Sequence, residues 1–306
     1  MPRFLVARLS SLGDVVCSLP AASALKAGFP DATVEWVVDP RFAPIVERCR
    51  SVDRVIPWKP SWRPFLHREP YDATLDLQGL LKSGLAIAFA RAPQKLGYHW
   101  QREGSWLFST RVLPDPSSLH IVDQYTDVAR AAGGVADRAD FALQPTEDDI
   151  LSVRRKLKER GVVGRFVALN PGAGWTSKRW PPHACVTLVN TLTREGIPTV
   201  LLGGNDSAQA AQEIASQTRE RTASLVGETN LGELMALVRL ASCHVGGDTG
   251  STHLAAAVGT AAVGLYSLTR PKRSCPYGQI DRCLRSDKLA EIPPEAVAER
   301  VLAALA

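Results

Sequence analysis

The chain has 306 residues, of which 45% are hydrophobic, and carries a net charge of +5 at neutral pH. This length and composition are more typical of two globular domains than of one. Its apolar stretches are shorter than the roughly 20 residues that a bilayer-spanning helix needs, and its charged N-terminus is unlike a secretory signal. We therefore expect a cytoplasmic protein without membrane-spanning segments.

The six cysteines form no Cys-x-x-Cys pair and no spacing with histidine that is typical of a metal site. Several lie in apolar segments, where a buried free thiol is the usual state. We therefore expect reduced cysteines and no bound metal.

The first half of the chain alternates strands and helices, the pattern of a parallel sheet with crossover helices. A proline at position 20 should disturb the first helix. In chain order the sequence predicts a strand at 4–9, a helix at 14–27, a strand at 33–38, a helix at 40–50, strands at 54–57 and 73–76, and a helix at 80–90.

A polar run at 144–149 marks a domain junction and starts a further helix. We place an N-terminal domain at 1–147 and a C-terminal domain at 148–306, with the last helix returning to the first domain. The second half repeats the α/β pattern, so we expect two doubly wound Rossmann-like domains. In chain order it predicts a helix at 148–160, a strand at 166–170, a helix at 182–195, a strand at 199–203, helices at 208–217 and 231–240, a strand at 243–245 and a helix at 294–305.

The most informative segment is a glycine-broken turn between an apolar strand and a helix of small residues near the C-terminus. Thr249 or Ser251 could cap this helix, and Gly250 allows a ligand to approach the free N–H groups of its first turn. Asp248 and His253 lie beside the turn, within reach of hydroxyl groups next to a phosphate. No Walker lysine and no G-x-G-x-x-G is present here. The alternative is a tight turn into a capped helix with no ligand.

Three further loops at predicted strand ends carry polar groups. In the first, at 9–14, Asp14 could be a general base or only a helix cap. The second, at 170–181, combines small residues with Lys178 and suits a pyrophosphate, unless it is a solvated surface loop. The third, at 201–206, is a glycine turn that could approach a ribose.

Residues 41–68 contain seven Lys or Arg and two acidic residues. Such a block is often a solvated surface. Because three tryptophans lie in or near it without a nucleic-acid motif, we favour an acidic sugar lipid or a membrane surface over nucleic acid as its partner.

Taken together, these segments resemble bacterial lipopolysaccharide heptosyltransferases, the enzymes that add heptose to the lipopolysaccharide inner core, and most closely those that act on Kdo-lipid A. The resemblance covers nearly the whole chain, and the order and spacing of its parts are specific. The matching segments are 10–15, 19–21, 36–38, 42–43, 52–57, 71–83, 178–181 and 248–254.

The resemblance implies a GT-B fold, in which two Rossmann-like domains face each other, and inversion at the anomeric carbon. It implies that Asp14 is the general base and that Lys178 stabilises the departing ADP phosphate, a role that other transferases give to a metal. We therefore expect no cofactor and no metal. Arg270 departs from the family pattern, which usually has an aspartate there, so local donor contacts are expected to differ.

The resemblance also implies the residues that bind the two substrates. The expected donor-binding residues are Gly172, Gly174, Thr176, Ser177, Gly204, Thr229, Asp248, Thr249, Gly250 and His253. The expected acceptor-binding residues are Ser11, Arg63, Gln78 and Lys82.

The predicted function is transfer of L-glycero-D-manno-heptose from ADP-heptose to Kdo-lipid A, with peripheral contact at the inner face of the inner membrane. Another nucleotide-sugar-dependent GT-B enzyme, such as a different sugar transferase or an epimerase, remains an alternative. An epimerase needs acid and base groups on both sides of the sugar, which the sequence does not identify. A dehydrogenase is disfavoured because the loop after the first strand lacks the dinucleotide fingerprint.

Overall fold

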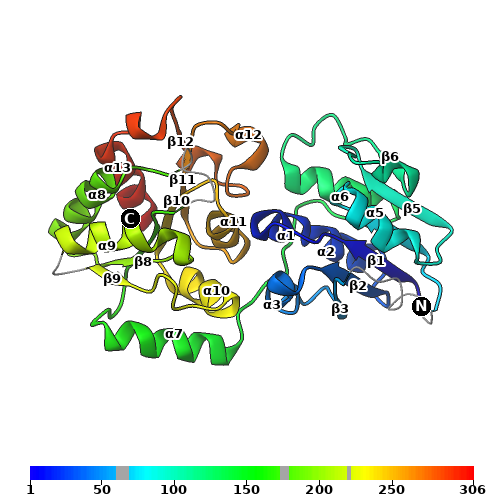
Figure 1. Cartoon of the computed structure of the whole chain (residues 1–306), viewed down its shortest axis with the longest axis horizontal. Helices are drawn as coiled ribbons and strands as arrows, with labels where there is room; N and C mark the ends of the chain where they lie inside the picture. Colours follow the sequence, from blue (N-terminus) through cyan, green and yellow to red (C-terminus); the bar gives the residue numbers. More distant parts are fainter. Residues whose placement is uncertain (60–68, 173–178, 219–221) are drawn as a thin grey trace. The chain divides into compact units, whose positions relative to one another are not determined.

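The computed structural model describes residues 1–59, 69–172, 179–218 and 222–306 (Figure 1). It divides into two compact units, Met1–Gln144 and Pro145–Ala306. Within the described residues each unit holds a six-stranded sheet whose strands all pair in parallel. Helices connect the strands, which confirms the predicted α/β class with two doubly wound sheets. No helix in the described ranges is long and apolar enough to cross a membrane.

The first unit has the strand order β3-β2-β1-β4-β5-β6. Its strands are β1 (Arg3–Ala7), β2 (Thr33–Val38), β3 (Arg54–Pro57), β4 (Ala73–Asp76), β5 (Gln94–Tyr98) and β6 (Thr110–Val112). Its helices are α1 (Leu12–Ser18), α2 (Pro20–Gly28), η1 (Pro40–Phe42), α3 (Ala43–Val46), α5 (Leu81–Ala88), η2 (Ser105–Leu107) and α6 (Ile121–Ala131).

Apolar strand residues pack on helices to form the core of this unit. Leu5 of β1 and Val37 of β2 pack against Ala86 of α5, and all three are almost fully buried. As predicted, Pro20 divides the first helical segment, because it begins α2 where it cannot continue the hydrogen bonding of α1.

Four elements of the first unit differ from the sequence prediction. The predicted helix at 40–50 is shorter, because η1 and α3 end by Val46. Strands β5 and β6 were not predicted, since β5 contains Gln, Lys and Gly and buries only its last two residues. Helix α6 was also not predicted, although it packs on α2 in the structure.

The second unit has the strand order β12-β11-β10-β7-β8-β9. Its strands are β7 (Val167–Asn170), β8 (Thr199–Leu201), β9 (Thr222–Ser224), β10 (Cys243–Gly247), β11 (Ala262–Tyr266) and β12 (Leu284–Arg285). Its helices are α7 (Glu147–Glu159), α8 (Pro182–Arg194), η4 (Asn205–Ser207), α9 (Ala208–Gln217), α10 (Leu231–Leu240), α11 (Gly250–Ala257), α12 (Pro271–Ser274), η5 (Ile280–Arg282), η6 (Leu289–Glu291) and α13 (Pro294–Leu305).

The last helix, α13, belongs to the second unit, whereas we expected it to return to the first domain. Val297 and Val301 are fully buried in the core that β7, β8, β10 and β11 share with α8. The Arg165 guanidinium also donates a hydrogen bond of 2.6 Å to the Leu305 carbonyl. The apolar face of α13 is therefore satisfied inside its own unit.

Candidate functional site

In each unit the strand order reverses beside the first strand, between β1 and β4 in the first unit and between β7 and β10 in the second. In open parallel sheets, ligands bind outside the carboxyl ends of the strands at such a reversal. Polar side chains gather at this point in both units, so each unit contains one candidate half-site.

The half-site of the first unit is built around an ion pair between Arg8 and Asp14. Arg8 follows β1 and is almost fully buried, and its Nη2 lies 2.9 Å from Oδ1 of Asp14. Its Nη1 donates to the Leu77 carbonyl at 2.5 Å, and its guanidinium lies over the Tyr125 ring. The Asp14 side chain is 39% exposed, so solvent and a substrate can reach its carboxylate.

Asp14 also caps α1, because its Oδ2 accepts hydrogen bonds from the Ser11 backbone N–H at 3.2 Å and the Ser11 hydroxyl at 3.0 Å. Burial alone would raise the pKa of the Asp14 carboxyl. The Arg8 charge and the two Ser11 hydrogen bonds outweigh that effect and hold the pKa below the usual range. Asp14 is therefore an ionised carboxylate at neutral pH, ready to accept a proton.

Asp76 and Gln78 shape the half-site from the end of β4. Asp76 is fully buried, and its Oδ1 accepts from the backbone N–H groups of Gln78 and Gly79 at 3.0 and 2.9 Å. Burial raises the pKa of the Asp76 carboxyl. The Gln78 Oε1 accepts from the Leu9 backbone N–H at 2.7 Å, so it fastens the loop after β1 to β4.

Of the predicted acceptor-binding residues, Lys82 and Ser11 are exposed near this loop. The Lys82 ammonium donates to the Ser10 hydroxyl at 3.4 Å, and Ser11 occupies the N-cap position of α1 and donates to Asp14. The structure therefore brings Ser11, Gln78 and Lys82 together around Asp14. Arg63 lies outside the described residues.

The half-site of the second unit contains an uncharged network of amide and hydroxyl groups. Asn170, at the end of β7, donates through Nδ2 to the Ser251 hydroxyl at 2.8 Å and to the Thr249 hydroxyl at 3.4 Å. Its Oδ1 accepts from the Gly172 backbone N–H at 3.0 Å. One asparagine thus links the loop after β7 to the turn before α11.

The buried imidazole of His244 contacts two hydroxyl groups of this network. His244 is fully buried in β10, and its Nε2 lies 3.3 Å from the Thr252 hydroxyl and 3.4 Å from the Ser251 hydroxyl. Burial lowers the pKa of His244 to about 3, so the ring is neutral at physiological pH. Thr252 also donates a hydrogen bond of 2.7 Å to the Gly247 carbonyl.

The turn before α11 differs in detail from the capping that we expected. Thr249 occupies the N-cap position, but its side chain does not bond a free N–H of the helix, and Ser251 lies inside the helix. Both hydroxyls join the Asn170 network instead. His253 Nε2 lies 3.2 Å from Asp248 Oδ1, so this pair closes one side of the turn. Gly250 begins the helix, as predicted.

Two glycines of the half-site sit where a side chain would collide with Ser207. A Cβ on Gly172 would lie 1.8 Å from the Ser207 Oγ, and one on Gly203, which has φ of +144°, would lie 2.6 Å from it. Gly204 is exposed and leads into η4. Thr229 follows β9 and is half-buried. The loops after β7 and β8 therefore pack too closely to tolerate added bulk.

Several predicted site residues lie outside the described part of the chain: Gly174, Thr176, Ser177 and Lys178. Conversely, the sequence prediction did not assign site roles to Arg8, Asn170 or His244. A charged residue at the end of the apolar first strand was the available signal for Arg8. Within the described ranges, no three His, Cys, Asp or Glu side chains are grouped to hold a metal ion.

Comparison with solved structures identifies the fold. A glycosyltransferase family 9 protein from Veillonella parvula superposes with a TM-score of 0.89 at 19% identity, covering 99% of this chain and 97% of the other. An Escherichia coli heptosyltransferase, WaaC, solved with ADP, superposes with a TM-score of 0.77 at 24% identity, covering 98% and 97%. The fold is therefore GT-B, the two-domain α/β class of glycosyltransferases, as predicted.

Sequence comparison identifies the family. The profile of glycosyltransferase family 9 (heptosyltransferase) matches residues 62–300. The chain is 27% identical to lipopolysaccharide heptosyltransferase 1 of E. coli over 98% of this chain and 99% of that protein. It is also 27% identical to lipopolysaccharide heptosyltransferase 2 of Salmonella typhimurium, covering 92% and 88%. The chain belongs to glycosyltransferase family 9 and is an enzyme of the heptosyltransferase type, as the sequence predicted.

Proposed function

We propose that this enzyme transfers L-glycero-D-manno-heptose from ADP-heptose to the Kdo-lipid A inner core of lipopolysaccharide, with inversion at the anomeric carbon. The observation that carries the proposal is the state of Asp14. It is the exposed, ionised carboxylate at the strand-order reversal of the first unit, and Arg8 and Ser11 fix its orientation. This is the group that an acceptor hydroxyl needs when it becomes a nucleophile.

The donor half of the proposal rests on the uncharged network of the second unit. Thr249, Gly250 and His253 surround the first turn of α11, whose N–H groups favour an anion. Gly172 lets the loops after β7 and β8 pack closely. We assign Gly172 and Gly204 to the nucleotide phosphates, with Gly174, Thr176, Ser177 and Thr229 as further contacts. Asp248, held beside His253, is suited to accept hydrogen bonds from sugar hydroxyls.

The reaction balances without a redox step. The acceptor oxygen bonds to the anomeric carbon while its proton passes to the Asp14 carboxylate, and the bond from that carbon to the ADP β-phosphate oxygen breaks. Because attack and departure occur on opposite faces of the sugar, the configuration inverts. We assign Lys178 to the negative charge that develops on the departing ADP. We propose that no metal or other cofactor takes part.

In the acceptor half of the proposal, we assign Ser11, Gln78, Lys82 and Arg63 to contacts with the Kdo-lipid A headgroup. Lys82 is exposed close to Ser10, where an acceptor carboxylate or phosphate can pair with its ammonium. We further propose that the enzyme works at the cytoplasmic face of the inner membrane, where it contacts the lipid bilayer and not nucleic acid.

The test is product analysis with purified enzyme, ADP-heptose and EDTA. Kdo-lipid A and heptosyl-Kdo-lipid A are supplied separately, and the new linkage is determined by mass spectrometry and NMR. The proposal expects one heptose on Kdo-lipid A with inverted configuration. Transfer only to heptosyl-Kdo-lipid A would assign the enzyme to the next position of the core. Epimerised nucleotide sugar without transfer would replace the proposal with an epimerase.

A further inference from the structure

Helix α5 has an apolar outer stripe that the site does not use. Leu81, Leu85 and Phe89 follow one another at intervals of four residues, so they lie on the same side of the helix. Leu81 is 43% exposed and Phe89 47% exposed, and Leu85 is partly buried. The opposite side of α5 carries the buried Ser83 and Ile87. The stripe is therefore presented outward.

The short helix η2 packs beside α5 and extends the stripe. The Phe108 ring, directly after η2, lies so close to Gly84 of α5 that a Cβ there would be 2.7 Å from it. Trp106 and Leu107 of η2 are 54% and 76% exposed. We call Leu81, Leu85, Phe89, Trp106 and Leu107 the α5–η2 surface.

Basic residues accompany this surface. Residues 77–114 contain five Lys or Arg (Lys82, Arg91, Lys95, Arg102 and Arg111) and one acidic residue, Glu103. Glu103 accepts a hydrogen bond of 3.3 Å from the Leu81 backbone N–H at the start of α5. The Arg102 guanidinium lies 5.7 Å from the centre of the exposed Trp100 ring. The segment is thus cationic as well as apolar.

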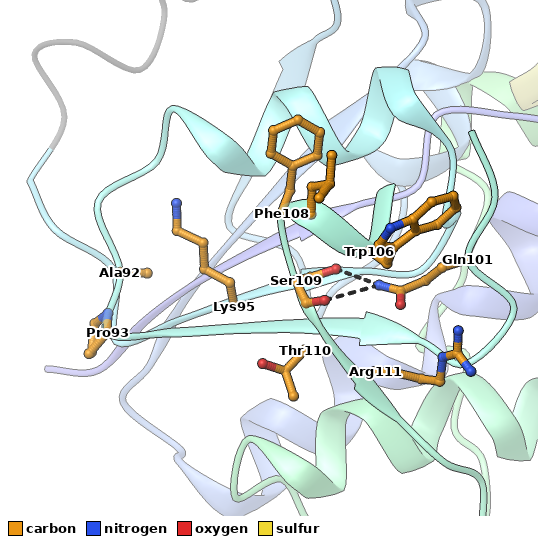
Figure 2. Close-up of a pocket in the computed structure, with 10 residues that line it drawn as sticks. Ala92, Pro93, Lys95, Gln101, Trp106, Phe108, Ser109, Thr110 and Arg111 are labelled. Carbon is orange, nitrogen blue, oxygen red and sulfur yellow. Dashed lines mark hydrogen bonds between the residues drawn. The ribbon is translucent and has the colours of Figure 1, made fainter. Parts of the chain in front are cut away.

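A cavity of about 650 Å³ adjoins the α5–η2 surface and is lined by both apolar and cationic side chains (Figure 2). Trp106, Leu107 and Phe108 contribute the apolar part, and Lys95 and Arg111 the cationic part. Figure 2 shows Gln101 donating two hydrogen bonds to Ser109, and both residues line the cavity. These two hydrogen bonds therefore hold the Gln101 side chain in place in the lining of the cavity.

We propose that the α5–η2 surface docks on an anionic lipid bilayer, with Trp106 and Leu107 entering the boundary of the acyl chains and Arg102 and Arg111 meeting lipid phosphates. This inference deepens the proposed function and rests on its lipid-borne acceptor. At a bilayer surface, lipid phosphates lie directly above the apolar acyl chains. Exposed arginines can pair with the phosphates, while the exposed tryptophan and leucine beside them can contact the acyl chains. An acidic soluble partner would leave the apolar side chains unmatched.

The experiment is co-sedimentation of the full chain with phosphatidylcholine vesicles, with and without phosphatidylglycerol. We expect binding only when phosphatidylglycerol is present, and weaker binding at high salt. Arg102→Gln and Arg111→Gln should each weaken binding about fivefold. Leu107→Glu should weaken it about tenfold or more, because an apolar contact is lost and a like charge is added.

The matched control is Leu151→Glu, since Leu151 is 62% exposed on α7 of the second unit, outside this surface. It should bind vesicles like the wild type. Thermal unfolding checks that each variant folds. Unchanged vesicle binding by Leu107→Glu would overturn the proposal. So would dimerisation or capture of an acidic protein that is lost in Leu107→Glu without any vesicle binding by the wild type.

Activity separates this inference from the proposed function. Leu107→Glu should transfer heptose normally to a deacylated acceptor in solution but at least about fivefold more slowly to an acceptor embedded in anionic vesicles. Equal loss on both acceptors would contradict a docking role. Absence of transfer by the wild type on both acceptors, with vesicle binding intact, would refute the proposed function and leave the docking surface standing.

Discussion

The two units share one strand order, and in both the polar residues lie where that order reverses, but the chemistry of the two positions differs. The first unit places charges there, with Arg8 beside Asp14 and near the buried Asp76. The second places an uncharged network there, with Asn170 bonded to hydroxyls that also contact the neutral His244, beside the Asp248–His253 pair. Fixed charge suits proton transfer, whereas neutral donors, glycines and a helix N-terminus suit the phosphates of a nucleotide.

The largest expected effect is a loss of turnover when the Asp14 carboxylate is replaced, and it distinguishes the role of the first unit from that of the second. Asp14→Asn should lower turnover at least about 100-fold, because the amide cannot accept the acceptor proton. Binding of ADP-sugar should stay near normal. Steady-state kinetics and calorimetry measure the two quantities. The control is Asp39→Asn, whose carboxylate also follows a strand of this sheet but pairs with the exposed Arg41; it should keep most of the turnover. Retained turnover in Asp14→Asn would reduce Asp14 to a helix cap.

The next largest effect is on stability, and it comes from Arg8, whose guanidinium pairs with the Asp14 carboxylate. Arg8→Met should lower the free energy of unfolding by about 2 kcal/mol, because charge-assisted hydrogen bonds are lost at a buried site. Asp14 has a pKa below its usual 3.8, so its stabilising effect is present above pH 3.8 and lost as the pH falls through the lowered pKa.

Arg8→Met should therefore also move the acid limb of the pH–activity profile upward. Urea unfolding and the pH dependence of kcat/KM test both parts. The matched control, Arg41→Met, breaks an exposed pair of 2.8 Å and should change stability by less than about 1 kcal/mol. An acid limb that stays in place in Arg8→Met would show that Asp14 does not set it.

In the second unit, Gly172→Ala should weaken ADP binding about tenfold, the scale of overpacking a tight contact. The new Cβ would lie 1.8 Å from the Ser207 Oγ, so the loop after β7 must move. Calorimetry with ADP measures the effect. Adding Ser207→Gly removes the obstructing side chain and should restore affinity. Unchanged affinity in Gly172→Ala would place the nucleotide elsewhere.

The smallest expected effect comes from His244. Its pKa is about 3 in the folded state and 6.5 in the unfolded state, so protonation favours unfolding as the pH falls below 6.5. Lowering the pH by one unit from there should cost about 1 kcal/mol of unfolding free energy. Urea unfolding should show this slope in the wild type and in the surface control His183→Gln, and a flatter one in His244→Gln. Equal slopes in all three would contradict a buried neutral imidazole.

Much of the fold could be predicted because several elements have strong local signals. The helix at 231–240 matched residue for residue, since Asn230 and Glu233 form a capping box before an apolar run. Strand β5 could not be predicted, because its Gln, Lys and Gly give no apolar pattern and its pairing with β4 depends on the fold.

The loops that carry the candidate site residues could be located from the sequence, but the hydrogen-bond partners of those residues could not. Parallel strands bring their carboxyl ends to one edge, which indicated the loops of Asp14 and Thr249 from spacing alone. The bond from Asn170 to Ser251 joins residues 81 positions apart, and only the register of β7 with β10 creates it. Likewise, the sequence around His244 does not indicate that its imidazole is buried against the Ser251 and Thr252 hydroxyls.

The most direct test of this division of roles is calorimetry with ADP, UDP, GDP and NAD in EDTA, on the wild type, Asp14→Asn and Gly172→Ala. We expect selective binding of ADP, equal in the wild type and Asp14→Asn and about tenfold weaker in Gly172→Ala. Preference for UDP or NAD, or loss of ADP binding in Asp14→Asn with none in Gly172→Ala, would contradict this division of roles.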